Sequence, residues 1–189
     1  KKARIKGFEA SLTAMPIEGL TLNLSGSYLD AIYTDYNFTP PPGYLLPTGR
    51  VDLSGTPFPL PKTQINASAT YEIPLRNLGP VAIDGLELSY HFYRQSKFEA
   101  DLRSYNAMQR TSPYSMSDVR LNVINLGGRK VDFSAFVKNV FNKEACIPEP
   151  QGVLNSAPNA TFGVGGTSGV LQCVPLPPRM TGASLTVTF

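Results

Sequence analysis

The side chains with the greatest chemical potential surround the single histidine of the chain, His91. Residues two apart share one face of an extended strand, so Glu87, Ser89 and Tyr93 would lie on the same side as His91. A histidine beside a serine or a carboxylate can act as a general base. Catalysis also needs mutual hydrogen-bond reach and room for a substrate, which spacing alone does not establish. A polar residue on a wetted strand face is the simpler interpretation, and we predict no catalytic residues.

Two cysteines, Cys146 and Cys173, lie in one stretch that is rich in glycine and proline. A pair confined to one long connection predicts a disulfide that forms in an oxidising compartment. The alternatives are two unpaired thiols or two metal ligands. We predict no metal site, because His91 is distant in sequence and no second cysteine pair or acidic cluster accompanies the two thiols.

The positions of these residues depend on seven segments in which apolar and polar side chains alternate. The segments cover about residues 3–14, 19–33, 63–74, 83–95, 117–126, 131–141 and the C-terminal stretch that ends at Phe189. A period of two indicates β-strands with one apolar and one polar face. Charged residues inside the strands, such as Glu72, Arg120 and Asp132, fall on the polar face. The pattern predicts an all-β, antiparallel sheet of about seven strands.

The C-terminal stretch indicates what covers the apolar face. Ala183, Leu185 and Val187 alternate with hydroxyl side chains, and the sequence reaches an aromatic residue, Phe189, with no polar tail. This pattern is expected where one face contacts lipid and the aromatic ring lies at the membrane interface.

The connections and the strand lengths also favour a membrane barrel. Short connections alternate with long ones, the short at about 15–18, 75–81 and 127–130 and the long at about 34–62, 96–116 and 142–177. Outer-membrane barrels have this pattern, with short periplasmic turns and long extracellular loops. The strands approach the ~9–11 residues that span a bilayer. The alternative is a soluble antiparallel sandwich, whose strands are usually ~5–6 residues long.

Composition excludes other classes of protein. The mean hydropathy is -0.10, and no apolar run approaches the roughly 20 residues of a membrane helix. The net charge is only +3 and the basic residues are scattered, so we expect no nucleic-acid partner. The sequence carries no leader with a charged start and an apolar core, which predicts a mature chain or a piece of a longer one.

Two segments resemble the C-terminal part of TonB-dependent outer-membrane receptors. The run DFSAFVKNVFN at residues 132–142 is similar to the penultimate strand of that family and its Asn-apolar-Phe-Asp/Asn turn. The run PRMTG at 178–182, which leads to Phe189, is similar to the closing strand. The runs GFEA at 7–10 and SGSYLDA at 25–31 resemble an upstream hairpin. The family usually has a tyrosine soon after the turn, and its absence here predicts a specialised last loop.

The resemblance implies that residues 1–189 are the C-terminal part of a 22-stranded transporter barrel, whose N-terminal plug and earlier strands lie outside this sequence. Such receptors import ferric siderophores, cobalamin, sugars or other scarce nutrients, with energy from the TonB complex of the inner membrane. The implied location is the outer membrane of a Gram-negative bacterium, with long loops extracellular and the C-terminus periplasmic. The implied partners are the bilayer, the plug, TonB through segments absent here, and the barrel-assembly machinery, which would read Leu185, Val187 and Phe189. No cofactor is implied.

Aromatic and basic residues in the first two long connections are the candidates for ligand contact, because exposed loop aromatics usually pack on themselves or on a partner. The candidates are Tyr36, Phe38, Tyr44 and Phe58 in the first connection and Arg103, Tyr105 and Arg110 in the second. For the second set, a solvated charged loop is the simpler interpretation. A further group is assigned to an aromatic girdle at the outer strand ends: Tyr28, Tyr33, Tyr90, Phe92 and Tyr93.

The sequence is also compatible with two other functions. One is a structural or adhesive outer-membrane barrel, which includes a phage receptor. The other is a barrel enzyme centred on His91.

Overall fold

The computed structural model describes residues 1–39, 51–75, 83–99, 110–126, 130–148 and 173–188. Seven long strands form one sheet in the order β1-β2-β5-β6-β9-β10-β13, and every neighbouring pair is antiparallel. Their bounds are Lys2–Ile17 (β1), Leu20–Asp35 (β2), Thr63–Pro74 (β5), Gly85–Gln95 (β6), Tyr114–Ile124 (β9), Val131–Lys138 (β10) and Met180–Val187 (β13). The predicted all-β class and the seven strands are confirmed.

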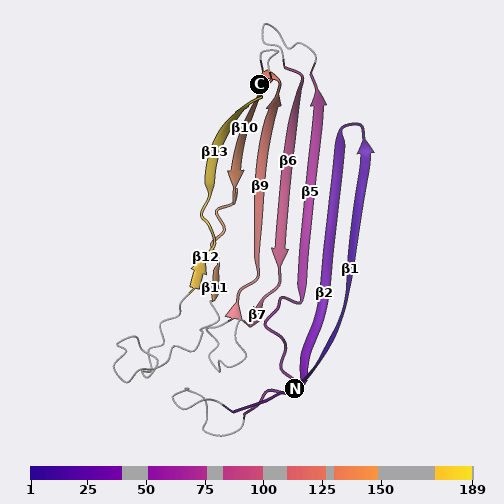
Figure 1. Cartoon of the computed structure of the whole chain (residues 1–189), viewed down its shortest axis with the longest axis vertical. Coiled ribbons are helices and arrows are strands. Elements are labelled where there is room, and N and C mark those ends of the chain that lie inside the picture. The colour runs from indigo at the N-terminus through magenta and orange to yellow at the C-terminus, as the bar shows by residue number, and fades with distance from the viewer. Residues whose placement is uncertain (40–50, 76–82, 100–109, 127–129, 149–172, 189) are drawn as a thin grey trace, which may run out of the picture.

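Three small ladders lie in the long connections. They pair β3 (Asn37–Phe38) with β4 (Val51–Asp52), β7 (Phe98–Glu99) with β8 (Arg110–Thr111), and β11 (Cys146–Pro148) with β12 (Cys173–Pro175). All three lie beyond the same end of the large sheet, and the short connections join the strands at the other end (Figure 1). We call these the loop end and the turn end of the sheet.

The predicted first turn at 15–18 is wrong in its position. β1 continues to Ile17, which pairs with Leu20, so the turn consists of Glu18 and Gly19. Gly19 has a φ of 79°, a backbone conformation that glycine adopts without steric cost. The register shifts between Ala14 and Ile17, and this irregularity accommodates Pro16, which has no N–H to donate.

The register aligns residues of the same kind across the whole sheet. One row on the apolar face runs Leu20, Tyr71, Leu88, Leu121, Ala135 and Ala183. The adjacent row on the other face runs Thr21, Thr70, Ser89, Arg120, Phe136 and Gly182. A slip of one residue in any strand would move its apolar side chains to the polar face, so the alternation fixes the register.

The apolar face has no protein layer over it within the described residues. Leu22, Leu88 and Val187 are 37%, 47% and 46% exposed, and Phe8 is 67% exposed. The only buried hydrophobic residues in the described part of the chain are Ala31 and Leu53, near the loop end. A soluble sandwich would cover these side chains with a second sheet, so this arrangement argues against that alternative.

No helix in the described ranges is long and apolar enough to cross a bilayer.

Two asparagines join the ends of the third long connection to the sheet. Asn139 is 1% exposed and donates from Nδ2 to the carbonyls of Lys143 and Pro177, both at 2.9 Å. Its Oδ1 accepts the Lys143 N–H at 2.8 Å, and Asn142 Oδ1 accepts the Arg179 N–H at 2.9 Å. The φ of both asparagines is positive, 50° and 48°, which ends β10 at Lys138 and not at 141 as predicted. These bonds give a physical reason for the NVFN motif.

Candidate functional site

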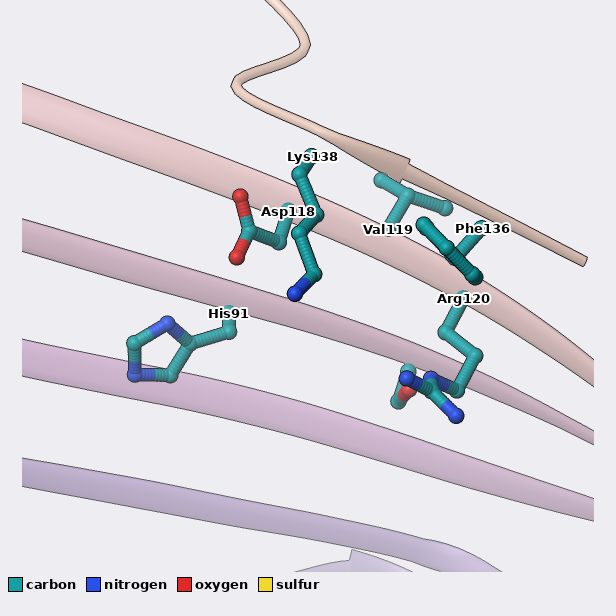
Figure 2. Close-up of a pocket in the computed structure, with 7 residues that line it drawn as sticks. His91, Asp118, Val119, Arg120, Phe136 and Lys138 are labelled. Carbon is teal, nitrogen blue, oxygen red and sulfur yellow. The ribbon is translucent and has the colours of Figure 1, made fainter. Parts of the chain in front are cut away.

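A polar hollow of about 180 Å³ lies on the polar face, across β6, β9 and β10. His91 of β6 is opposite Asp118 of β9, and Arg120 is opposite Phe136 of β10. Figure 2 shows His91, Asp118, Arg120 and Lys138 projecting to the same side of the three ribbons. The antiparallel register therefore gathers residues from three strands that are far apart in sequence, from Ser89 to Lys138.

The Phe136 ring lines the hollow and lies close to two cations. The Arg120 guanidinium carbon lies 5.5 Å from the Phe136 ring centroid, and Lys138 Nζ lies 5.7 Å from it. These distances suit cation–π attraction. Gly182 is opposite Phe136 in β13, and a Cβ there would come within 2.5 Å of the ring. The glycine of the PRMTG motif therefore leaves room for the ring.

The hollow has a surplus of positive charge. Asp118 Oδ1 accepts the Asn139 N–H at 2.9 Å, so this carboxylate helps to hold the third connection. Arg120 Nη1 donates to Ser134 Oγ at 3.4 Å, and within the described residues neither Arg120 nor Lys138 forms an ion pair. Two cations beside an aromatic ring can bind an anionic group of a ligand or of a partner segment.

The residues expected around His91 do not form a catalytic set in the described part of the structure. Glu87 Oε1 accepts a hydrogen bond from Asn122 Nδ2 at 2.6 Å, and Tyr93 Oη donates to Gln95 Oε1 at 2.6 Å. No hydrogen bond links His91 to Glu87, Ser89 or Tyr93 among the residues that the structure describes. No group of three or more His, Cys, Asp or Glu residues in those ranges is placed to hold a metal ion.

A second candidate surface is an aromatic stack at the loop end. The Tyr33 ring lies 4.2 Å from the Phe58 ring at an interplanar angle of 15°, and 4.6 Å from the Tyr36 ring. Lys1 Nζ lies 4.9 Å from the Tyr36 ring centroid. Two of the predicted ligand-contact residues, Tyr36 and Phe58, are therefore brought together by a third ring, that of Tyr33.

The backbone of residues 53–58 holds the stack in place. The Gly55 N–H donates to the Tyr33 carbonyl at 2.7 Å, and the Phe58 N–H donates to the Ala31 carbonyl at 2.9 Å. The Leu53 N–H donates to the Tyr36 carbonyl at 2.8 Å, and Leu53 is 5% exposed. The segment thus runs back along the end of β2, so the rings rest on a bonded frame.

The other predicted ligand-contact residues stay predictions. The backbones of Phe38 and Arg110 lie in the ladder strands β3 and β8. Tyr44, Arg103 and Tyr105 lie outside the described residues.

The girdle assignment is wrong for Tyr33 and Tyr93. Tyr33 belongs to the loop-end stack, and Tyr93 lies on the polar face, where its hydroxyl accepts a bond from Gln64 Nε2 at 3.4 Å. Tyr28 and Tyr90 lie on the apolar face and are 40% and 38% exposed. Odd or even position along the strand separates these tyrosines. Tyr33 and Tyr93 have the odd positions of the polar residues in β2 and β6, whereas Tyr28 and Tyr90 have the even positions of the apolar residues.

The cysteines and the C-terminal strand complete the list of predicted residues. The backbone register sets Cys146 opposite Pro175 and Cys173 opposite Pro148, so the two cysteines lie on paired strands of one ladder. The disulfide between them stays a prediction. Leu185 and Val187 are 61% and 46% exposed on the apolar face, and Phe189 lies outside the described residues.

Comparison with known proteins adds one finding. The family model described as TonB dependent receptor-like, beta-barrel matches residues 1–140. Searches of curated proteins and of solved structures found no match.

Proposed function

The chain belongs to the TonB-dependent receptor β-barrel family, and from this premise we propose that it forms part of the wall and loops of a TonB-energised importer. Members of the family are outer-membrane transporters and not enzymes. We propose that the imported nutrient is one that is scarce outside the cell, such as a ferric siderophore, cobalamin or an oligosaccharide.

One observation carries the proposal, namely that the two faces of the sheet have opposite character and that no other described segment covers either of them. Leu12, Leu24 and Leu88 on the apolar face are 62%, 50% and 47% exposed. On the other face, Asn23 Nδ2 donates to Ser68 Oγ, and Glu87 accepts from Asn122. A lipid-facing band with a polar, hydrogen-bonded interior is the arrangement of a transmembrane barrel wall.

We propose that further strands of the full receptor close the sheet. Within the described residues β1 and β13 each pair on one side only. An open strand edge leaves unpaired N–H and C=O groups in hydrocarbon, which is strongly unfavourable. A barrel of the 22-strand type would enclose an N-terminal plug. In this arrangement residues 1–189 are the C-terminal part of the barrel.

We propose that the loop end is extracellular and the turn end periplasmic, as in other barrels with short periplasmic turns. β13 then runs toward the periplasm, where Leu185, Val187 and Phe189 would be read by the assembly machinery. TonB would act from the periplasmic side through the plug.

The two candidate surfaces favour an anionic ligand with flat or cyclic parts. The stack of Tyr33, Tyr36 and Phe58 presents ring faces at the loop end, and the polar hollow offers Arg120 and Lys138. We propose that ligand first contacts the stack, together with Phe38, Tyr44, Arg103, Tyr105 and Arg110 of the same connections. It then passes the cations on the polar face. A ferric siderophore has the required charge.

Energy coupling is tested by uptake in paired strains. The full-length receptor is expressed in a tonB-positive strain and in a tonB-deleted strain, and both are supplied with radiolabelled ferric siderophores, cobalamin or oligosaccharides. The proposal expects accumulation of at least one of these only in the tonB-positive strain. Binding at the cell surface is expected in both strains. Equal accumulation in both, or surface binding with no accumulation in either, would instead support a passive or adhesive barrel.

Replacement of Phe58 by alanine is expected to weaken surface binding of the ligand about five- to tenfold, because one face of the aromatic stack is lost. Binding to intact cells at equal receptor abundance measures the effect. Phe141→Ala is the matched control, since Phe141 is a 64% exposed phenylalanine at the base of the third connection, whereas the stack belongs to β2 and the first connection. An equal loss of ligand binding in both variants would show that the aromatic stack is not part of the binding surface.

A further inference from the structure

A second hollow, of about 590 Å³, opens at the loop end beside β2, β5 and β6. Tyr28, Leu60 and Phe98 contribute apolar walls, and the only charged residues that line it are Lys62 and Lys97. Tyr28 pairs with Thr63 at the loop end of the β2–β5 ladder, on the apolar face, and both residues line the hollow. The hollow therefore adjoins the face that we place in lipid.

Among the described residues, the basic side chains that share the parity of the apolar face lie at the loop end. At the loop end, Arg4, Lys6 and Arg94 share the parity of that face and are exposed. One acid, Asp30, lies close to these basic residues. Its Oδ2 atom is 3.8 Å from Arg4 Nη2, and its Oδ1 atom is 4.0 Å from Lys62 Nζ. Asp30 is opposite Lys6 in the register. Among the described residues at the turn end, Asp84 has this parity and is an acid.

This distribution leaves a net positive loop end directly above an apolar band. Asp30 contacts two cations at once, and its side chain is 33% exposed while those of Arg4 and Lys62 are 50% and 55% exposed. A single carboxylate does not neutralise the group. Basic residues at the edge of a hydrocarbon-facing surface attract the phosphates of membrane lipids.

We propose that the hollow binds one lipid of the outer leaflet that carries phosphate and several acyl chains. An acyl chain lies against Tyr28, Leu60 and Phe98, and a phosphate lies between the ammonium groups of Lys62 and Lys97. Arg4 and Lys6 attract the same headgroup from β1. This inference rests on the proposed function, because it requires hydrocarbon on the apolar face. It assigns the hollow to a resident lipid, and Phe58 is the one residue of the loop-end stack that also lines it.

The test uses the full-length receptor, purified in detergent and stripped of lipid. Native mass spectrometry follows the titration of the receptor with diphosphoryl lipid A. The K62Q/K97Q variant is expected to bind this lipid at least about tenfold more weakly, since each basic residue contributes about fivefold at such a surface. Enzymatically dephosphorylated lipid A is expected to bind the native receptor and K62Q/K97Q equally. The matched control K130Q/K143Q removes the same charge from exposed lysines outside the hollow and is expected to bind as the native receptor does.

The proposal fails if K62Q/K97Q and the native receptor bind diphosphoryl lipid A equally. It also fails if K130Q/K143Q loses as much affinity, because binding would then follow net charge. Displacement of the lipid by millimolar inorganic phosphate would identify a free-anion site, and displacement by the imported nutrient would assign the hollow to transport. Outer-membrane fractionation and TonB-dependent uptake of K62Q/K97Q are measured in parallel. Retained uptake with unchanged lipid binding overturns this inference alone, whereas loss of outer-membrane localisation in the native receptor overturns the proposed function.

Discussion

Replacement of Leu88 by arginine is expected to destabilise the folded barrel by about 2–4 kcal/mol, because the guanidinium would face hydrocarbon. Leu88 lies inside β6, is 47% exposed, and is flanked in its row by Tyr71 and Leu121. In the cell we expect a large fall in the amount of receptor in the outer membrane. Urea unfolding of the full-length receptor in lipid vesicles measures the change in free energy.

The matched control places the same arginine on the other face. Thr70 of β5 is opposite Ser89 of β6, one row from Leu88 but on the polar side. Thr70→Arg is expected to change the free energy of unfolding by less than about 1 kcal/mol, since its charge reaches water. Equal destabilisation by the two substitutions would mean that both faces are buried in protein.

Replacement of Asn139 by alanine is expected to have an effect of similar size, a loss of about 3–4 kcal/mol. Alanine removes two donated bonds and one accepted bond at a site that is 1% exposed, and it leaves the carbonyls of Lys143 and Pro177 without that donor. It also strains the backbone, because a φ of 50° suits asparagine better than alanine. Limited proteolysis of the full receptor is expected to cut the third connection much faster.

Asn139→Gly separates the two causes. Glycine accepts the positive φ but lacks the amide, so it is expected to recover about 1 kcal/mol of the loss and no more. Full recovery by glycine would show that the backbone conformation alone matters. Unchanged proteolysis in Asn139→Ala would show that the asparagine does not tie the two ends of the connection together.

The strands can be predicted from the sequence because a strand in a barrel wall alternates apolar side chains toward lipid with polar side chains toward the interior. Alternation in segments such as 63–74 gives both the strand and the face of every residue, and the structure has β5 at the same bounds, Thr63–Pro74. The positions of the strand ends do not follow from alternation, because they depend on the backbone conformation of single residues. The positive φ of Asn139 ends β10 early, and Pro16 is accommodated by a register shift and not by the turn.

The sequence predicts only those residues of the polar hollow that lie in one strand. Spacing along β6 groups His91 with Glu87 and Ser89, but the partner across the ladder is Asp118, and Lys138 lines the same hollow from β10. Cross-strand neighbours depend on turn lengths and register, which no spacing within one strand contains. The sequence predicts part of the loop-end stack, since Tyr36 and Phe58 are aromatic residues of a long connection. Tyr33 was missed, although its parity already separated it from Tyr28.

The central claim is that lipid covers the face that bears Leu88. Spin labels on Leu88→Cys and Thr70→Cys in the full receptor, reconstituted in vesicles, test it by power-saturation electron paramagnetic resonance. The native receptor carried through the same labelling supplies the background. The account predicts that molecular oxygen, which partitions into lipid, relaxes the label at position 88, and that a water-soluble nickel chelate relaxes the label at position 70. Preferential relaxation of the label at 88 by the nickel chelate, or low accessibility of that label to both reagents, would contradict it.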